Sequence, residues 1–330
     1  MAKRRKRKLK TGVKVFFVFI LVLLIGGGYY LFYGSGVELD KYYDEIAANF
    51  KNNSNEYKKC LASSDFTEDY FSEKLGNIRD EMIGMFESDA NFEYEDLDNG
   101  YSFGKGENYS SYAASVSKLP AVFYAYHLAD EGNLDLNKEL TYTANYKAGG
   151  SGVIQKDPIG SKYKISDLLY KAIRYSDNIA YFMILDEIGG TATVRNYWKD
   201  LGYTITYTDR FGNLSPSLGN GYIKEVYKYY LDGSENAKKL VEDMEISDNL
   251  DFVKVDDTPV AHKYGEYTEG GGYYNDVSLV FTSHPFALSI TSTKGLSNST
   301  KEFFLKVHEL ALDFNNLYYE EKVNYCLGED

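Results

Sequence analysis

The chain has 330 residues, and its 44% hydrophobic and 26% charged residues are typical of globular rather than disordered proteins. The formal net charge is −13 although eight lysines and arginines lie in the first 14 residues, so the remainder carries about −21. Because so acidic a body repels phosphate groups, the composition excludes nucleic acid as an expected partner.

The N-terminal segment predicts a membrane anchor. Residues 15–33 contain no charged side chain, and these 19 residues are long enough to cross the hydrocarbon core as one transmembrane helix. Basic flanks stay in the cytoplasm, so residues 1–14 are expected to be a cytoplasmic tail of a single-pass cell-membrane protein whose main domain is extracellular. A cleaved signal peptide is the alternative, but the apolar stretch is longer than usual and ends in aromatic residues. Residues 34–64 are interpreted as a stalk.

Residues 65–327 are predicted to form one α+β domain. The apolar spacing over residues 69–87 indicates a helix, and the alternation over residues 92–103 indicates a hairpin that turns at Asp98-Asn99-Gly100. The remaining elements are helices over 115–130, 165–175, 179–188 and 193–201, strands over 261–267, 277–282 and 287–293, and a closing helix over 299–316. Because helices stand between an early hairpin and late strands, we expect an antiparallel sheet flanked by helices, with an inserted all-helical subdomain.

The chain contains two cysteines, Cys60 and Cys326, one near each end of the part expected outside the cell. In an oxidising compartment they would be able to pair and tie the ends of the domain together. Two free thiols fit the sequence equally well. The pairing therefore stays open at this level.

The first chemical motif is S-x-x-K, formed by Ser115 and Lys118 at the start of a predicted buried helix. Positions i and i+3 share one helix face, so the lysine amine is expected beside the serine hydroxyl. A desolvated lysine has a lowered pKa and is able to take the proton of a serine nucleophile. The structural alternative is an ordinary N-cap serine followed by a surface lysine.

Two further motifs follow in order along the chain. Ser176-Asp177-Asn178 lies between two predicted helices, where a short turn would project a hydroxyl and an amide into a cleft. Lys263-Tyr264-Gly265 lies on a late predicted strand, where a lysine would hold a substrate carboxylate and a backbone N–H would serve an oxyanion. Each motif is weak alone, but the ordered set is specific.

This set resembles the S-x-x-K, S-D-N and K-T-G motifs of the penicillin-recognising serine hydrolases, specifically class A β-lactamases and related D,D-peptidases. The resemblance covers roughly residues 65–327 and implies the β-lactamase/transpeptidase-like fold. It also implies a role for each matching position. Ser115 would be the acyl nucleophile, Lys118 its proton acceptor, Ser176 a proton shuttle and Asn178 a contact to the substrate amide. Lys263 would bind the substrate carboxylate, with Tyr264 beside it in the substrate-binding motif. The backbone N–H groups of Ser115 and Glu266 would form the oxyanion hole, with Gly265 allowing close approach.

The sequence departs from the family at three places. Class A β-lactamases carry an E-x-x-L-N segment whose glutamate activates the deacylating water, but residues 209–215 contain no glutamate. Asp209 is the nearest carboxylate, and its place beside Arg210 favours a structural ion pair. Tyr264 replaces a threonine or serine, and the interval from Asn178 to Lys263 is shorter than usual. Without a base for water, an acyl-enzyme would turn over slowly or wait for another acceptor.

Three interpretations remain open. The first is a membrane-anchored extracytoplasmic serine hydrolase that forms an acyl-enzyme with β-lactams or D-alanyl peptides, as a slow β-lactamase or as a penicillin-binding D,D-peptidase. The second is a catalytically impaired module that binds cell-wall peptide, and the third is another hydrolase or a structural surface protein. The histidines show no metal-ligand spacing, so no metal or cofactor is expected; His127 is interpreted as a packed residue and His262 as pointing away from the cleft. The oligomeric state is not predicted.

Overall fold

The computed structural model describes residues 55–268 and 272–328. The predicted tail and anchor, and most of the predicted stalk, lie outside these residues. Within the described part of the chain, no helix is both long enough and apolar enough to span a membrane.

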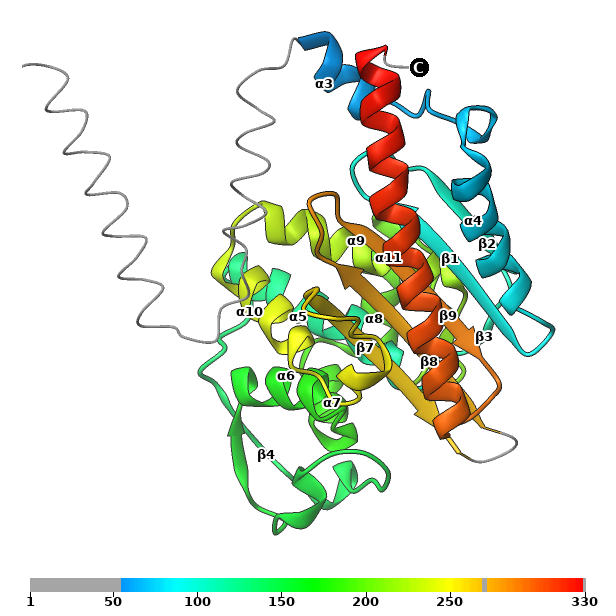
Figure 1. The fold of residues 1–330 in the computed structure, drawn as a ribbon. Helices are drawn as coiled ribbons and strands as arrows, with labels where there is room; N and C mark the ends of the chain where they lie inside the picture. Colours follow the sequence, from blue (N-terminus) through cyan, green and yellow to red (C-terminus); the bar gives the residue numbers. More distant parts are fainter. Residues whose placement is uncertain (1–54, 269–271, 329–330) are drawn as a thin grey trace, which may run out of the picture. The chain divides into compact units, whose positions relative to one another are not determined.

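The centre of the domain is a five-stranded antiparallel sheet in the order β2-β1-β9-β8-β7 (Figure 1). The expected early hairpin forms, and its strand β1 pairs with β9, so that Phe92 lies opposite Ile290 and Tyr94 opposite Leu288. Burial alternates along β1, with Phe92 and Tyr94 inside and Glu93 and Glu95 at the more exposed positions. The strands are β1 (Ala90–Asp96), β2 (Ser102–Lys105), β7 (Val260–Tyr267), β8 (Tyr273–Val280) and β9 (Phe286–Ser292).

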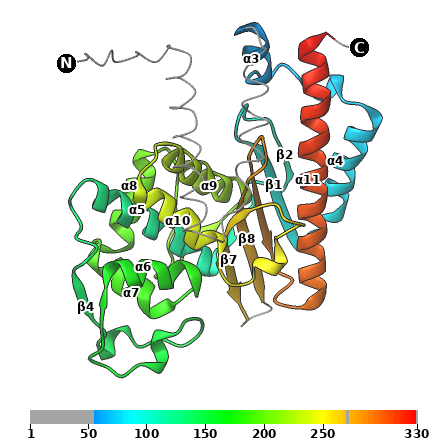
Figure 2. The same ribbon diagram turned by 60° about the vertical axis from the view of Figure 1, so that its left-hand side comes forward.

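One face of the sheet is covered by α4 (Glu73–Met85) and α11 (Asn298–Leu327) (Figure 2). Ser297 caps the start of helix α11, because its side chain accepts a hydrogen bond from the backbone N–H of Thr300. The prediction that this helix ends at residue 316 was wrong, since it continues to Leu327. Tyr318, Tyr319 and Lys322 keep the last turns buried, whereas the sequence there is too polar to extend an apolar pattern.

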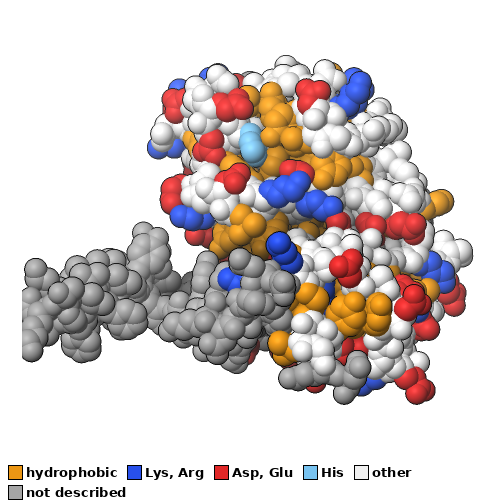
Figure 3. Space-filling model, turned by 90° about the horizontal axis from the view of Figure 1, so that it is seen from above, with side chains coloured by type: hydrophobic (Ala, Val, Ile, Leu, Met, Phe, Trp, Pro, Cys, Tyr) orange, Lys and Arg blue, Asp and Glu red, His pale blue; other side chains and the backbone are white. Residues whose placement is uncertain are grey.

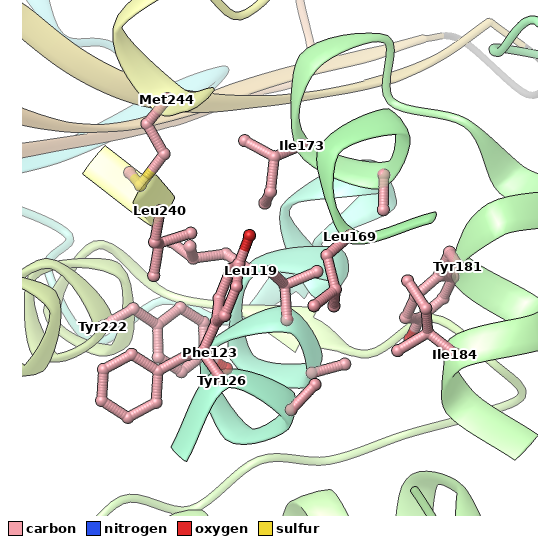
Figure 4. Packing of buried hydrophobic residues seen from close by; sticks show 14 of the residues in the cluster. Leu119, Phe123, Tyr126, Leu169, Ile173, Tyr181, Ile184, Tyr222, Leu240 and Met244 are labelled. Carbon is pink, nitrogen blue, oxygen red and sulfur yellow. The ribbon is translucent and has the colours of Figure 1, made fainter. Parts of the chain in front are cut away.

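A helical region covers the opposite face, and its core surrounds α5. Leu119, Phe123 and Tyr126 of α5 lie among side chains of neighbouring helices, including Leu169 of α6 and Leu240 of α10 (Figure 4). The helices are α5 (Lys118–Asp130), α6 (Ile165–Arg174), α7 (Asn178–Glu187), α8 (Gly190–Asp200), α9 (Pro216–Leu231) and α10 (Glu235–Glu245). Because β1 and β2 precede these helices and β7 to β9 follow them, the expected inserted subdomain is present. The prediction that it is all-helical was wrong, since two short strands at residues 139–141 and 162–164 pair within it.

Helices α9 and α10 were not predicted, and Gly219 explains part of this for α9. Glycine lowers helix propensity and weakens a helical pattern. Here it is needed, because a Cβ at Gly219 would lie 2.5 Å from Ser289 Oγ and 2.6 Å from Val277 Cγ1 on the sheet. The residue that obscures the helix in the sequence is thus the one that lets the helix approach the sheet.

Two short antiparallel pairs complete the described strands. Strand β3 (Ser111–Tyr112) pairs with β6 (Asn213–Leu214), and β4 (Glu139–Thr141) pairs with β5 (Lys162–Lys164). The first pair brings the segment before Ser115 beside the segment that follows Arg210.

The described chain begins with α3 (Asn55–Leu61), which a disulfide joins to the end of α11. Cys60 and Cys326 have Cα atoms 5.8 Å apart, so the pairing that the sequence left open is present. Helix α3 falls within residues 34–64, the range interpreted as a stalk. Figure 3 shows the molecule from above the view of Figure 1, and on this face apolar side chains lie between acidic and basic ones.

Candidate active site

Ser115 and Lys118 lie side by side where a short 3-10 turn (Ala114–Ser117) leads into α5. Lys118 Nζ is 2.7 Å from Ser115 Oγ. Lys118 is fully buried, and Ser115 keeps 6% of its surface exposed. Ala114 adopts a φ of +48°, a conformation that costs free energy for a residue with a Cβ and is often found at functional sites. The predicted adjacency of hydroxyl and amine is present.

Burial and the neighbouring Lys263 charge favour the neutral form of the Lys118 amine. Ser176 O lies 2.6 Å and Asn178 Oδ1 2.7 Å from Nζ, and both oxygens can only accept hydrogen bonds. A neutral amine donates two hydrogen bonds and accepts one, so its lone pair would face the Ser115 hydroxyl. Burial, together with the charge of Lys263, holds the pKa of Lys118 well below its usual 10.5, although Asp177 acts in the opposite direction.

Asp177 fixes the turn that carries Ser176 and Asn178. Its carboxylate caps α7 by accepting from Ala180 N at 2.9 Å, and it also accepts from the backbone N–H groups of Val153 and Ile154 at 2.6 and 2.8 Å. Gly152 makes this contact possible, because a Cβ there would lie 2.4 Å from the carboxylate carbon. Asp177 is therefore a positioning residue, a role that the sequence motif did not reveal.

Ser176 connects the two lysines of the site. Its Oγ lies 3.2 Å from Lys118 Nζ and 3.1 Å from Lys263 Nζ, and its own φ is +50°. Asn178 is held from the other side, since its side-chain amide donates to Gly149 O at 2.8 Å. The three motifs thus converge, as the sequence predicted.

Lys263 lies deeper than a substrate-binding residue was expected to lie. It is fully buried, and its ammonium donates to Ser176 Oγ and to Tyr264 O at 2.8 Å. Burial lowers the pKa of Lys263 to about 7, although the charges of Asp276 and Asp248 oppose this shift. Tyr264 is 5% exposed, and its ring centroid lies 4.2 Å from Lys263 Nζ.

Gly265 allows the edge of β7 to lie against the 3-10 turn that carries Ser115. A Cβ on Gly265 would lie 2.4 Å from Ala113 O and 3.0 Å from Ser115 N. No side chain larger than hydrogen fits this gap without a shift of backbone. The close approach places the backbone of Gly265 and Glu266 next to that of Ser115.

Ser115 opens onto a cleft of about 490 Å³. Glu266, Asn178 and the glycine-rich segment 149–151 contribute to its walls, together with the aromatic residues Tyr112, Phe211 and Tyr267. A second hollow of about 470 Å³ adjoins it at Gly149. Ser115 is therefore accessible to a ligand of substantial size.

The segment expected to carry a deacylation glutamate presents an aromatic ring instead. The Phe211 ring centroid lies 5.6 Å from Lys118 Nζ. Asp209 accepts a hydrogen bond from Phe211 N at 2.6 Å, while the Arg210 guanidinium lies over the Phe182 ring. The expected ion pair between Asp209 and Arg210 is absent from the described residues, because each side chain is held by another partner.

His127 and His262 lie as the sequence predicted. His262 is fully buried on the sheet face opposite Lys263, with Nδ1 2.7 Å from Asp276 Oδ2. Alternation along β7 explains this orientation. His127 packs with its ring 4.2 Å from that of Tyr229 and 4.4 Å from that of Phe123.

Comparison with known proteins gives the family. Residues 74–314 match the model of the beta-lactamase enzyme family, a span of more than half of the chain. The chain belongs to the β-lactamase enzyme family. The family inferred from the ordered motifs is thus confirmed, and this member keeps the S-x-x-K and S-D-N motifs but carries tyrosine within the third one.

Relatives of this β-lactamase family member share moderate identity. A beta-lactamase of Streptomyces cellulosae is 33% identical over 108 residues, which are 32% of this chain and 34% of the relative. Beta-lactamase ROB-1 of Haemophilus influenzae is 27% identical over 156 residues, 46% of this chain and 47% of the relative. The chain therefore spans about a third to a half of the length of these curated relatives.

Solved structures of the family show the same fold. A mutant of PBP-A, determined as an acyl-enzyme complex with penicillin G, has a TM-score of 0.65 and 20% identity, and the match covers 73% of this chain and 97% of that one. A beta-lactamase from Chitinophaga pinensis also has a TM-score of 0.65, with 19% identity over 73% and 99% of the two chains. At such identities the likeness establishes the α+β fold alone.

Proposed function

We propose that this chain is a serine acyl-transfer enzyme that forms an acyl-enzyme through Ser115 with β-lactams or D-alanyl peptides. The observation that carries the proposal is the buried Lys118 amine, 2.7 Å from a Ser115 hydroxyl that opens onto the cleft. A neutral Lys118 takes the hydroxyl proton while Oγ bonds to the substrate carbonyl carbon. The backbone N–H groups of Ser115 and Glu266 stabilise the oxyanion.

Ser176 completes the acylation step. When the carbon–nitrogen bond of the substrate breaks, the leaving nitrogen needs a proton. Ser176 Oγ lies within hydrogen-bond distance of both Lys118 Nζ and Lys263 Nζ, so it can donate its own proton and regain one from Lys118. The step ends with an ester on Ser115 and a neutral Lys118.

Phe211 favours slow release of the acyl group. Its ring lies near Lys118, and none of the described residues 209–215 presents a carboxylate that would activate water in the cleft, since Asp209 is held by Phe211 N. We expect an acyl-enzyme without a base from residues 209–215 to persist or to pass its acyl group to an amine. Slow release favours a penicillin-binding D,D-peptidase over a fast β-lactamase. If the acyl group is never released or never formed, the chain would be a catalytically impaired module that binds cell-wall peptide.

The experiment is covalent labelling of the full chain in detergent with a fluorescent penicillin. We expect one adduct, which mass spectrometry places on the peptide containing Ser115 and which Ser115→Ala lacks. Label that decays within seconds would indicate β-lactam hydrolysis, and label that persists would indicate a penicillin-binding protein. An unlabelled wild-type chain, tested also with an uncharged fluorophosphonate, would contradict acyl transfer.

Gly265→Ala is expected to slow acylation of Ser115 by about 10²-fold, because the added Cβ pushes the β7 edge away from the nucleophile turn and misaligns the oxyanion donors. The labelling rate under excess penicillin measures the effect. Gly84→Ala is the matched control, since a Cβ at this exposed position of α4 meets no atom within 4 Å. Equal labelling rates in the two variants would contradict the role given to Gly265.

We further propose that residues 15–33 anchor the chain in the cell membrane, with residues 1–14 in the cytoplasm and the β-lactamase-like domain outside. The uncharged 19-residue stretch after a basic run supports this arrangement. Protease added to intact cells should then degrade the domain, and the domain should sediment with membranes. Recovery of an intact domain in the cytosol would contradict the anchor.

A further inference from the structure

The part of the site that should recognise a substrate carboxylate is closed. Lys263, the cation in the third motif, is fully buried, and its hydrogen bonds go to Ser176 Oγ and Tyr264 O. It does not reach the wall of the cleft beside Ser115. A free carboxylate in the cleft would therefore meet no exposed ammonium from this residue.

Tyr264 is part of this closure. Its ring lies 4.2 Å from Lys263 Nζ, and the side chain is 5% exposed. The ring therefore packs against the Lys263 ammonium. Burial, followed by the charges of Asp248 and Glu266, raises the pKa of the Tyr264 phenol to about 12, so the phenol stays neutral and supplies no positive charge.

The charge that does border the cleft is negative. Glu266 is the one charged residue among the described residues that line it, and no lysine or arginine is among them. The nearby cation Arg174 does not compensate, because it forms an ion pair with Asp248. Partial burial raises the pKa of the Glu266 carboxyl.

We propose that this cleft selects acyl donors whose leaving-group side carries no negative charge, such as a C-terminal amide or ester in place of a free carboxylate, with Glu266 as the specificity-determining residue. The inference rests on the acyl-transfer function proposed above for the choice of substrate. The charge of Glu266 would then repel the carboxylate of ordinary penicillins and weaken their binding. We expect a free carboxylate to weaken binding about tenfold, the size of one like-charge contact at a partly buried site.

The test is equilibrium binding to the full-length Ser115→Ala variant in detergent, which removes acylation from the measurement. The probes are an N-acetylated D-alanyl-D-alanine as the free acid and as the C-terminal amide, compared by calorimetry at low salt. We expect the amide to bind about tenfold more tightly. Adding Glu266→Gln should bring the ratio of the two affinities close to one, while Glu235→Gln, a charge removed from an exposed position of α10, should leave the ratio unchanged.

Three results would overturn the inference: an acid that binds as tightly as the amide, a ratio that Glu266→Gln leaves unchanged, or an amide that does not bind at millimolar concentration. These results are separable from failure of the acyl-transfer proposal. A chain labelled at Ser115 that prefers the acid keeps its proposed function and loses the charge selectivity. A chain that is never labelled but prefers the amide loses acyl transfer and keeps the selectivity as that of a binding module.

Discussion

Lys118→Met is expected to slow acylation of Ser115 by about 10²- to 10⁴-fold, the range usual for loss of a general base. Methionine keeps the length of the side chain but has no lone pair that can take the hydroxyl proton. Lys118 Nζ, 2.7 Å from Oγ, is the base that the described site offers. Labelling rates with fluorescent penicillin, measured against Ser115→Ala as the blank, check this result.

Lys118→Arg tests whether Lys118 acts as a base or only through a positive charge. Arginine stays protonated at all relevant pH values, so it keeps a positive charge near Ser115 and cannot accept a proton. We expect it to lose as much activity as Lys118→Met. Thermal unfolding must be followed in parallel, because both changes disturb the hydrogen bonds to Ser176 O and Asn178 Oδ1. An arginine variant that acylates at the wild-type rate would show that Lys118 acts only through its charge.

The pH dependence of the acylation rate in the wild-type chain also tests Lys118 as the base. The base must be neutral, so the acylation rate rises as pH passes upward through the folded pKa of Lys118. Burial and the Lys263 charge lower that pKa well below 10.5. The rate should therefore reach its plateau well below pH 10.5 and fall on acidification. A rate that rises only near pH 10.5, the usual lysine pKa, would contradict a lowered pKa.

Removing both cysteines is expected to lower the free energy of unfolding by about 2–5 kcal/mol, the usual range for loss of a native disulfide. The bond between Cys60 and Cys326 closes a loop with a sequence separation of 266, so it restricts the unfolded chain strongly. Urea unfolding of the Cys60→Ser, Cys326→Ser double variant measures the change.

Reductant provides the control for this disulfide. It should destabilise the wild-type chain by a similar amount and leave the double variant unaffected. Labelling of Ser115 should persist under native conditions, because α11, to which the disulfide is attached, lies across the sheet from α5. Equal urea midpoints for the oxidised wild type and the double variant would contradict a stabilising bond.

Much of the site could be predicted because most of its polar residues belong to short sequence motifs. Ser115 and Lys118 are three residues apart, and helical geometry alone places them together. The order of Ser176-Asp177-Asn178 and Lys263 along the chain was informative through family resemblance. The role of Asp177 was not predictable, since its partners Val153 and Ile154 lie more than twenty residues away and offer only backbone N–H groups.

Local patterns also predicted the early hairpin, the buried helix α5 and the three late strands, because periods of two and 3.6 residues need no knowledge of distant partners. They failed for α9, where Gly219 weakens the helical pattern and is required by the sheet beneath it. They also ended α11 too early, because the burial of Tyr318, Tyr319 and Lys322 depends on elements far away in the chain.

Motif spacing sufficed for the family and for the adjacency of Ser115 and Lys118, since these properties depend on residues that are neighbours in the chain or match a known order. Tertiary packing alone decided that Lys263 is enclosed, that Phe211 faces Lys118 and that Glu266 borders the cleft. Burial and charge environment are sums over contacts between distant segments, and no local pattern encodes such sums.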